Sequence, residues 1–376
     1  MKRKKLLIIS HTEHYKNQNQ QIVGWGATIN EVDYLADFWE EVVHIGCLYD
    51  SVAPKSSLPY AKNNIRFVPI PPYGGMSVRD KLLILVKIPR IIQQVVCNLK
   101  GASEVQLRLP TSMGVFLLPI FSFFLPRNYT FWVKYAGNWN QENPSFSYRF
   151  QRWWLKKNWA RCKVTINGFW EKQPKHCLSF ENPCLTEDDV ARGEIIGQQK
   201  AFKGPFILAF VGRLEDAKGV SRIVEALRMI PVGQIEEVHF IGDGTKRKQY
   251  EDALLFLNER AIFHGFLSKD AVHTVLSKSH FFLLPSESEG FPKVIAEAAC
   301  SGVIPVVSDV GSISHYIHSG NGFLWVWKEH SYGEILQDAL ASPSKDLKEK
   351  SAKVRELAEK FTFVSYLEKL NQLILK

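Results

Sequence analysis

The sequence predicts an α/β fold built from two doubly wound, Rossmann-like domains in tandem. Its 376 residues exceed what one hydrophobic core usually serves, so two domains of roughly 150–200 residues each are expected. In both halves short apolar runs alternate with stretches of helical period, which is typical of a parallel sheet covered on both faces. Ligands of such folds bind beyond the carboxyl ends of the strands, so we predict a site in a cleft between the domains.

The first domain is expected over residues 1–185. Its predicted strands are short runs rich in aliphatic and aromatic residues: Lys5–Ser10, Glu41–Gly46, Asn64–Ile70, Glu104–Leu109, Tyr129–Tyr135 and Lys163–Ile166. Helices are predicted between them near Thr28–Glu40, Val78–Leu99, Met113–Phe124 and Phe146–Ala160. This alternation indicates a parallel sheet in the first domain.

The second domain is expected over residues 205–360, where the alternation starts again. Residues 186–204 have no sustained apolar period and contain the acidic run Glu187-Asp188-Asp189, which predicts a linker between the domains. Residues 361–376 are amphipathic, and we expect a terminal helix there that packs back on the first domain. The predicted strands of the second domain are Phe206–Val211, Glu237–Ile241, Ala261–Phe263, Phe281–Leu284 and Val303–Ser308.

The composition favours a cytoplasmic protein without disulfide bonds or zinc sites. The six cysteines form no Cys-x-x-Cys pair and no regular framework. The apolar run that follows the basic residues 2–5 is too short for a signal peptide and fits a first strand. The uncharged run over residues 113–126 is too short to span a bilayer.

The formal net charge of +9 favours anionic partners. Between Arg149 and Lys163 the basic residues are interleaved with Trp153, Trp154 and Trp159, and no acidic residue occurs. This pattern is typical of a surface that meets the anionic headgroups of a membrane, and it equally fits helices that cover a sheet. No recognisable nucleic-acid-binding module accompanies the charge, so nucleic acid is not expected as a partner.

A strand-to-helix turn in the second half carries two carboxylates. Glu289 lies in the turn that follows Phe281–Leu284, and Glu297 comes eight positions later, inside the predicted helix. Pro292 is expected at the first helical position, where its missing N–H costs nothing. Free N–H groups at a helix start attract anions and carboxylates bind hydroxyls, so the turn predicts a site for a polyol joined to a phosphate. Two solvated glutamates are the alternative explanation.

Another turn of the second half carries two cations. Arg213 and Lys218 follow the strand Phe206–Val211 and lie between Gly212 and Gly219. Two permanent cations five residues apart can hold both phosphates of a diphosphate, whereas solvated surface charges are the simpler alternative.

Closely spaced glycines precede two further predicted helices. They occur in Ile241-Gly242-Asp243-Gly244 and in Gly24-Trp25-Gly26. A chain without side chains at these positions can pass close to a phosphate or a sugar, although ordinary turn chemistry explains each motif equally well.

Taken together, the motifs of the second half resemble those of the family 4 glycosyltransferases. These are retaining enzymes of the GT-B fold, which move sugars from nucleotide donors. The likeness extends over residues 206–322, and the order and spacing of its motifs are specific; in the first half it is one of architecture. The matching segments are Phe210-Val211-Gly212-Arg213 with Lys218-Gly219, Phe240-Ile241-Gly242-Asp243-Gly244, Phe263-His264-Gly265-Phe266 and Pro285 through Glu297.

The resemblance implies a GT-B fold whose second domain binds a nucleotide-sugar donor. Arg213 and Lys218 would hold the donor diphosphate and neutralise it as it leaves, while Glu289 would bind the transferred sugar. Glu297 would bind the ribose hydroxyls of the nucleotide. Further donor contacts are expected from Gly26, Gly212, Gly265, Phe266, Gly290, Phe291 and Pro292.

The first domain is expected to supply the acceptor side of the site. Many relatives have a histidine where this chain reads Lys134-Tyr135-Ala136-Gly137-Asn138-Trp139. Tyr135 or Asn138 would contact sugar hydroxyls, although neither is a good base at neutral pH. His11 is an alternative base, and Arg108, at the end of a predicted strand, is expected to bind an acceptor phosphate.

The sequence contains no Asp-x-Asp motif, and the two cations can replace a metal, so we expect metal-independent transfer with retention. The expected function is a cytoplasmic glycosyltransferase at the inner face of the plasma membrane. It would extend a glycan or a lipid-linked acceptor, as in the biosynthesis of a bacterial lipopolysaccharide, capsule or other surface polysaccharide. The alternatives are a sugar-nucleotide epimerase, a phosphorylase, or a non-catalytic subunit that binds sugar nucleotides.

Overall fold

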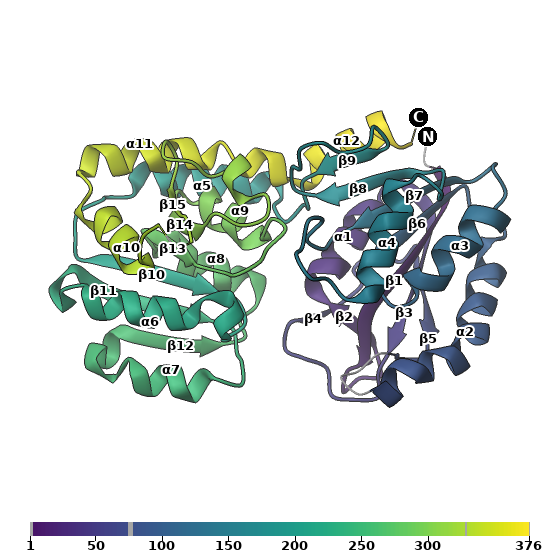
Figure 1. Ribbon diagram of the computed structural model, residues 1–376, viewed down its shortest axis with the longest axis horizontal. Helices are drawn as coiled ribbons and strands as arrows, with labels where there is room; N and C mark the ends of the chain where they lie inside the picture. The colour runs from purple at the N-terminus through teal and green to yellow at the C-terminus, as the bar shows by residue number, and fades with distance from the viewer. Residues whose placement is uncertain (1–2, 74–77, 328, 376) are drawn as a thin grey trace. The chain divides into compact units, whose positions relative to one another are not determined.

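The computed structural model describes residues 3–73, 78–327 and 329–375, and it divides the chain into two compact units (Figure 1). Unit 1 contains Met1–Phe180 together with Leu367–Lys376, and unit 2 contains Glu181–Tyr366. Among the described helices, none has the length and apolar character that a membrane crossing requires. All six cysteines are free thiols.

The sheet of unit 1 combines a parallel series with a short antiparallel extension. The parallel strands follow the spatial order β5, β3, β1, β6, β7, β8 and β9, while β2 and β4 add antiparallel at the C-terminal end of β1. Strand β1 is longer than predicted because His14 to Lys16 pair with β2. The strands are β1 (Arg3–Lys16), β2 (Ile22–Trp25), β3 (Trp39–Leu48), β4 (Ser57–Pro59), β5 (Ile65–Ile70), β6 (Glu104–Leu109), β7 (Thr130–Tyr135), β8 (Lys163–Asn167) and β9 (Cys177–Phe180).

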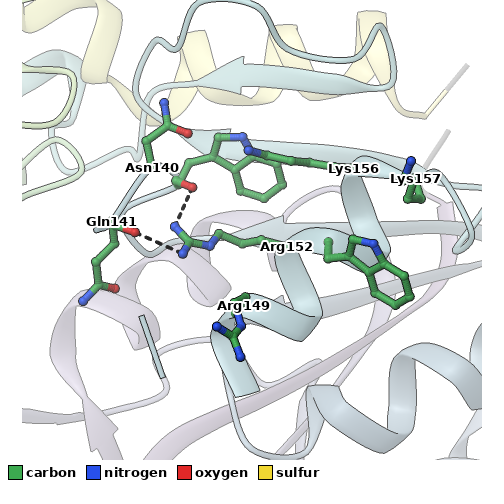
Figure 2. A pocket seen from close by; sticks show the side chains of 8 residues that line it. Asn140, Gln141, Arg149, Arg152, Lys156 and Lys157 are labelled. Carbon is green, nitrogen blue, oxygen red and sulfur yellow. Dashed lines mark hydrogen bonds between the residues drawn. The ribbon is translucent and has the colours of Figure 1, made fainter. Parts of the chain in front are cut away.

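Helix α4 (Phe146–Lys156) makes hydrogen bonds to two loops of this sheet. In α4, Gln151 accepts a hydrogen bond from the Thr111 N–H (3.2 Å), after β6. Arg152 donates to the carbonyl oxygens of Trp139 (2.7 Å) and Gln141 (3.1 Å), after β7 (Figure 2). The helices are α1 (Gly26–Ala36), α2 (Val78–Leu99), α3 (Gly114–Phe124), α4 (Phe146–Lys156) and the end of α12 (Phe363–Leu373).

Unit 2 has a fully parallel sheet in the spatial order β12, β11, β10, β13, β14 and β15. The strands are β10 (Phe206–Val211), β11 (Ile235–Ile241), β12 (Ala261–Gly265), β13 (Phe281–Leu284), β14 (Ile304–Ser308) and β15 (Phe323–Trp325). The helices are α5 (Glu187–Gln199), α6 (Val220–Met229), α7 (Arg247–Ala253), α8 (Lys269–Lys278), α9 (Lys293–Cys300), α10 (Tyr332–Ala341) and α11 (Ser344–Arg355).

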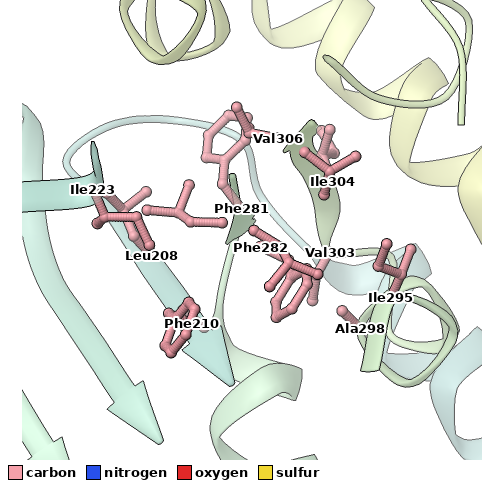
Figure 3. Close-up of a cluster of buried hydrophobic side chains, with 14 of the residues drawn as sticks. Leu208, Phe210, Ile223, Phe281, Phe282, Ile295, Ala298, Val303, Ile304 and Val306 are labelled. Atoms are coloured by element: carbon pink, nitrogen blue, oxygen red, sulfur yellow. The ribbon is translucent and has the colours of Figure 1, made fainter. Parts of the chain in front are cut away.

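The core of unit 2 is built around β13, which lies between β10 and β14. Phe281 through Leu284 are almost completely buried, which explains why this strand is apolar at every position rather than alternating. Phe281 and Phe282 pack with Leu208 and Phe210 of β10 and with Ile295 of α9 (Figure 3). This core holds the start of α9 and the ends of β10 and β13 in fixed positions.

The structure corrects the linker predicted over residues 186–204, because most of that segment is helix α5 of unit 2. Thr186 and Asp189 form a capping box at its start, with hydrogen bonds of 3.0 and 3.1 Å. Where an apolar face is usual, the helix has glycines: a Cβ at Gly193 would lie 2.3 Å from the Cys300 carbonyl oxygen of α9. The helix therefore packs closely through glycines. It lacks the repeat of apolar residues from which a helix would have been predicted.

Candidate functional site

The two predicted ligand-binding turns of unit 2 lie at the same edge of the sheet. Residues 212–219 follow β10 and residues 285–292 follow β13, and these two strands pair in parallel. The Glu287 N–H donates to the Ala217 carbonyl oxygen at 3.0 Å, so the turns are joined directly through their backbones. Their meeting follows from the strand order, since neighbouring parallel strands end at the same side of a sheet.

An ion pair between Lys218 and Glu289 joins the cationic turn to the acidic one. The Lys218 Nζ lies 2.6 Å from the Glu289 Oε1, and the two side chains are 27% and 11% exposed. Arg213 is 69% exposed and lies 3.5 Å from Glu215. An ammonium has three donors, so Lys218 keeps the capacity to bind an anion while it contacts Glu289. The arrangement offers two cations and one carboxylate in a small space.

Arg222 of α6 is a third cation that contacts the acidic turn. It was not assigned to the site from the sequence. It donates to the Pro285 carbonyl oxygen (3.1 Å) and pairs with Glu287 (2.8 Å). Its guanidinium also lies over the Trp327 ring, 4.1 Å from the centroid. Arg222 lies in the first turn of α6, just after the left-handed Gly219, and its place at a helix start beside Lys218 was the signal that could have identified it.

A further support comes from residues 309–312, which follow β14. Gly311 has φ +65°, and a Cβ there would lie 1.9 Å from the Glu289 carbonyl oxygen. The Gly290 carbonyl oxygen accepts hydrogen bonds from the Ser312 N–H (3.0 Å) and from its hydroxyl (3.1 Å). This loop therefore fixes the backbone at Glu289, and the sequence offered only a glycine after a strand as its signal.

Helix α9 begins at the acidic turn with Pro292 as its N-cap rather than as its first residue. Pro292 does not donate and offers no side-chain acceptor, and no side-chain hydrogen bond caps this end among the described residues. The Ile295 N–H donates to the Pro292 carbonyl oxygen (3.1 Å), so an anion at this helix start would meet the N–H groups of Lys293 and Val294. The side chain of Phe291 is 2% exposed and stacks on Phe361, so only its backbone can line a ligand.

Glu297 lies in the second turn of α9 and is partly exposed. Burial raises the pKa of its carboxyl group, and the charges of Lys269 and Lys293 oppose that rise. Both lysines are engaged elsewhere: the Lys269 Nζ lies 2.9 Å from Asp189, and Lys293 donates to the Pro183 carbonyl oxygen at 2.9 Å. A half-buried carboxylate with neighbouring cations is a suitable acceptor for ligand hydroxyls.

The glycine turns of unit 2 pack against the cationic turn. A Cβ at Gly242 would lie 2.0 Å from the Gly212 carbonyl oxygen, and one at Gly244 would lie 2.4 Å from that of Leu214. The Gly242 N–H donates to the Gly265 carbonyl oxygen at 2.8 Å. Phe266, the next residue, is 51% exposed. These contacts bring the end of β12 to the site, with an aromatic side chain at its surface.

In unit 1, Arg108 and Tyr135 are engaged within the fold. The Arg108 guanidinium is 11% exposed and pairs with Glu31 at 3.0 Å. Its Nε also donates to Gln106 at 2.7 Å. Tyr135 is 1% exposed and packs edge to face on Trp139. The structure thus places the Arg108 charge against a carboxylate and the Tyr135 ring in the core.

The other predicted residues of unit 1 also have local partners. The His11 ring Nε2 makes a hydrogen bond with the Tyr73 carbonyl oxygen (3.1 Å), and Asn138 Oδ1 accepts from the Asn140 N–H (3.0 Å). Gly26 begins α1, and a Cβ there would lie 2.7 Å from the Ser56 carbonyl oxygen, so packing already requires a glycine. The described residues contain no cluster of three or more His, Cys, Asp or Glu side chains able to hold a metal ion.

Residues 191–361 match the model of the family described as glycosyl transferases group 1. An uncharacterised glycosyltransferase of Methanocaldococcus jannaschii is 30% identical over 175 residues, which cover 45% of this chain and 42% of that protein. The alpha-galactosylglucosyldiacylglycerol synthase of Streptococcus pneumoniae is 27% identical over 214 residues, covering 55% and 54% of the two chains. The chain thus spans about half the length of these two relatives.

Solved structures resemble the whole chain. Sucrose-phosphate synthase of Thermosynechococcus elongatus has a TM-score of 0.73 at 17% identity, covering 99% of this chain and 98% of its own. HepE of Anabaena, solved in complex with UDP and glucose, has a TM-score of 0.66 at 15% identity and covers 99% of each chain. The predicted fold class is confirmed: the units are the two Rossmann-like domains of a GT-B fold.

Proposed function

We propose that the protein is a retaining, metal-independent glycosyltransferase that uses a nucleotide-diphosphate sugar as donor. The observation that carries this proposal is the 2.6 Å pair between Lys218 and Glu289, beside the exposed Arg213 and the uncapped start of α9. Cations and free N–H groups suit a diphosphate, while carboxylates suit sugar hydroxyls. A nucleotide-diphosphate sugar combines both chemistries, and the Glu297 carboxylate would take the ribose.

In the proposed reaction the bond between the sugar C1 and the diphosphate oxygen breaks, and a bond from C1 to the acceptor oxygen forms on the same face. The electron pair of the broken bond stays with the diphosphate, which takes up the acceptor proton on a phosphate oxygen. Negative charge grows at that diphosphate in the transition state, where Arg213, Lys218 and the start of α9 stabilise it. Glu289 holds the sugar hydroxyls as C1 becomes cationic.

We further propose a glycan or lipid-linked acceptor, and a role in surface polysaccharide biosynthesis at the inner face of the plasma membrane. Relatives whose printed names include a diacylglycerol glycolipid synthase and a putative teichuronic acid biosynthesis glycosyltransferase support this class of acceptor.

The activity is tested by finding the donor and then following its turnover. A thermal-shift screen with nucleotide sugars identifies the donor, since a ligand that binds only the folded protein raises its melting temperature. With donor and acceptor present, we expect release of free nucleoside diphosphate at the same rate with and without EDTA, and an unchanged anomeric configuration in the product. Interconversion of donor sugars without release would establish an epimerase, and release of sugar 1-phosphate on addition of phosphate a phosphorylase. Binding without turnover would establish a non-catalytic subunit.

The proposed membrane surface is supported by exposed aromatic side chains at α3 and α4. Phe123 and Phe124 end α3 and are 73% and 78% exposed, and Phe146 begins α4 with 71%. Trp153 is 44% exposed, whereas Trp154 lies in the core. Large exposed aromatic residues beside basic ones are typical of an interfacial surface.

Flotation with vesicles of phosphatidylcholine and phosphatidylglycerol tests the membrane proposal. We expect the protein to float with these vesicles at low salt and to be released as salt screens the basic residues. Replacing Phe123 and Phe124 by serine is expected to reduce the floated fraction. Absence from the vesicle fraction at low salt would contradict a membrane surface here.

A further inference from the structure

Helix α4 and the loop after β7 enclose a basic cavity in unit 1. The cavity has a volume of about 510 Å³, which lies within the range of small-molecule sites. Figure 2 shows the side chains that line it, with the Arg152 guanidinium hydrogen-bonded to the loop. Its lining residues are Trp139, Asn140, Gln141, Arg149, Arg152, Trp153, Lys156 and Lys157, so the charged members are all cations.

The cations of this cavity have no carboxylate partner. Among the described residues, none of the four forms an ion pair within 4.0 Å, in contrast to Arg108 and Lys134 of the same unit, which both contact Glu31. Arg149 instead lies over the Phe146 ring at 5.9 Å, and Lys156 lies over the Trp139 ring at 5.5 Å. Burial lowers the pKa of Lys156, with the charge of Arg152 as a further cause.

Helix stability does not account for these charges. Lys156 and Lys157 at the C-terminal end of α4 suit the helix dipole, but Arg149 lies near its start and Arg152 near its middle, and the first turn has no acidic residue. The spacings 149–152 and 152–156 place like charges on one face, which costs about 0.2–0.5 kcal/mol per pair in an isolated helix. An anion bound in the cavity would attract each of these cations and offset the repulsion between them.

The indole rings of Trp139 and Trp153 indicate which class of anion the cavity binds. Trp139 is fully buried and forms a wall of the cavity, while Trp153 is 44% exposed at its rim. Arg152 is 9% exposed, and its bonds to the 139–141 loop fix its guanidinium in place. A preorganised guanidinium with exposed cations around it binds phosphate oxygens, and the aromatic rim favours a ligand with an apolar portion.

We infer that this cavity binds the phosphate or diphosphate group of an amphiphilic acceptor, such as a sugar joined through a diphosphate to an isoprenoid chain, whose sugar hydroxyl receives the transferred sugar. This inference rests on the proposed function, because it names the acceptor of that reaction. The inference places the acceptor phosphate at α4 instead of at Arg108, where the sequence predicted it. The Arg108 guanidinium pairs with Glu31 at 3.0 Å, whereas the α4 cations have no ion pair among the described residues. The loop that forms the cavity wall directly follows Asn138, a predicted sugar contact.

The test measures ligand binding to the full chain by calorimetry. Arg213→Ala with Lys218→Ala removes the proposed donor site, so that remaining diphosphate binding reports on the α4 cavity. Into this background we introduce Arg149→Gln with Lys156→Gln, both of which are exposed side chains that leave the bonds of Arg152 intact. The matched control is Lys163→Gln with Lys175→Gln, which removes the same charge from exposed positions of unit 1 outside the cavity. The probes are geranyl diphosphate, inorganic pyrophosphate and dihexanoyl phosphatidylglycerol.

Geranyl diphosphate is expected to bind the donor-site variant and the control equally, and to lose affinity by about tenfold or more in the cavity variant, since hydrogen bonds to charged groups contribute about 1.5–3 kcal/mol each. Pyrophosphate, which lacks the apolar chain, is expected to bind more weakly. Equal binding by cavity variant and control would overturn the inference, as would tighter binding of phosphatidylglycerol, which would identify a membrane-lipid site.

Failure of the proposed function has a separate readout. UDP binding is measured in a chain that has an intact donor site and carries only the cavity substitutions. We expect this binding to equal that of the original chain. A chain that binds geranyl diphosphate in the cavity but no nucleotide would contradict the donor assignment and leave the phosphate site standing.

Discussion

Replacing Lys218 by alanine is expected to lower turnover by about 10²- to 10³-fold, the usual cost of removing one preorganised donor to a developing negative charge. The substitution removes a cation from the proposed leaving diphosphate and leaves Glu289 without its 2.6 Å partner. The effect should fall on kcat more than on the KM of the donor, because the diphosphate gains its charge in the transition state. Steady-state release of nucleoside diphosphate measures it.

Two further variants separate catalysis from structure in this prediction. Lys248→Ala removes a lysine of the same unit that is 81% exposed and paired with Asp252, and its turnover should remain within about twofold of the original, as for exposed pairs generally. In Lys218→Ala with Glu289→Gln both partners of the ion pair are neutral. Because Glu289 is itself placed in the site, the double variant is compared by its melting temperature. If Lys218 served only to balance Glu289, Lys218→Ala would lower the melting temperature and the double variant would restore it, and that result would contradict the assignment.

Replacing Glu31 by glutamine is expected to destabilise unit 1 by about 3–5 kcal/mol, the cost of removing one partner from a buried ion pair. Glu31 is 3% exposed, and its Oε1 lies 3.0 Å from Arg108 and 2.6 Å from Lys134. Glutamine keeps the shape of the side chain but removes the charge that both cations contact. Denaturant titration measures the free energy of unfolding, and hydrogen exchange at β6 and β7 assigns the loss to unit 1.

The matched control for Glu31 is an ion pair at the surface of the same unit. Asp37 lies 2.6 Å from Lys62, and the two side chains are 48% and 42% exposed. Asp37→Asn is expected to change the free energy of unfolding by less than about 1 kcal/mol, because solvent screens exposed charges. If Glu31→Gln cost no more than this control, the buried network would have little part in stabilising unit 1.

The sequence predicted the architecture of unit 2 well because each of its strands is a local feature. A strand buried on both faces is apolar throughout, and Phe281–Leu284 was recognisable on that ground alone. Glycines and the proline marked where strands ended and α9 began, to within one residue at Pro292. The short strands β2, β4, β9 and β15 were missed, since three or four residues carry too little pattern to identify.

Two of the predictions concern residues whose environment depends on distant parts of the chain. Helix α5 packs through Gly193 and Gly197 rather than through an apolar face, so its helical character depends on α9 and α11. Arg108 was recognised as a cation at a strand end, but its partner Glu31 lies 77 positions away in the sequence. Contacts between distant residues decide whether a charge is available to a ligand, and no local pattern reports them.

The sequence by itself determined the strands and turns of the candidate site and the identity of its charged groups, because strands, turns and helix starts are encoded over a few neighbouring residues. Only the tertiary structure decided which charges meet. It joined Lys218 to Glu289, placed Gly311 against the backbone of that turn, and left the α4 cations without carboxylate partners among the described residues. The reason is that a charge is balanced by whatever the fold brings within a few ångströms, irrespective of distance along the chain.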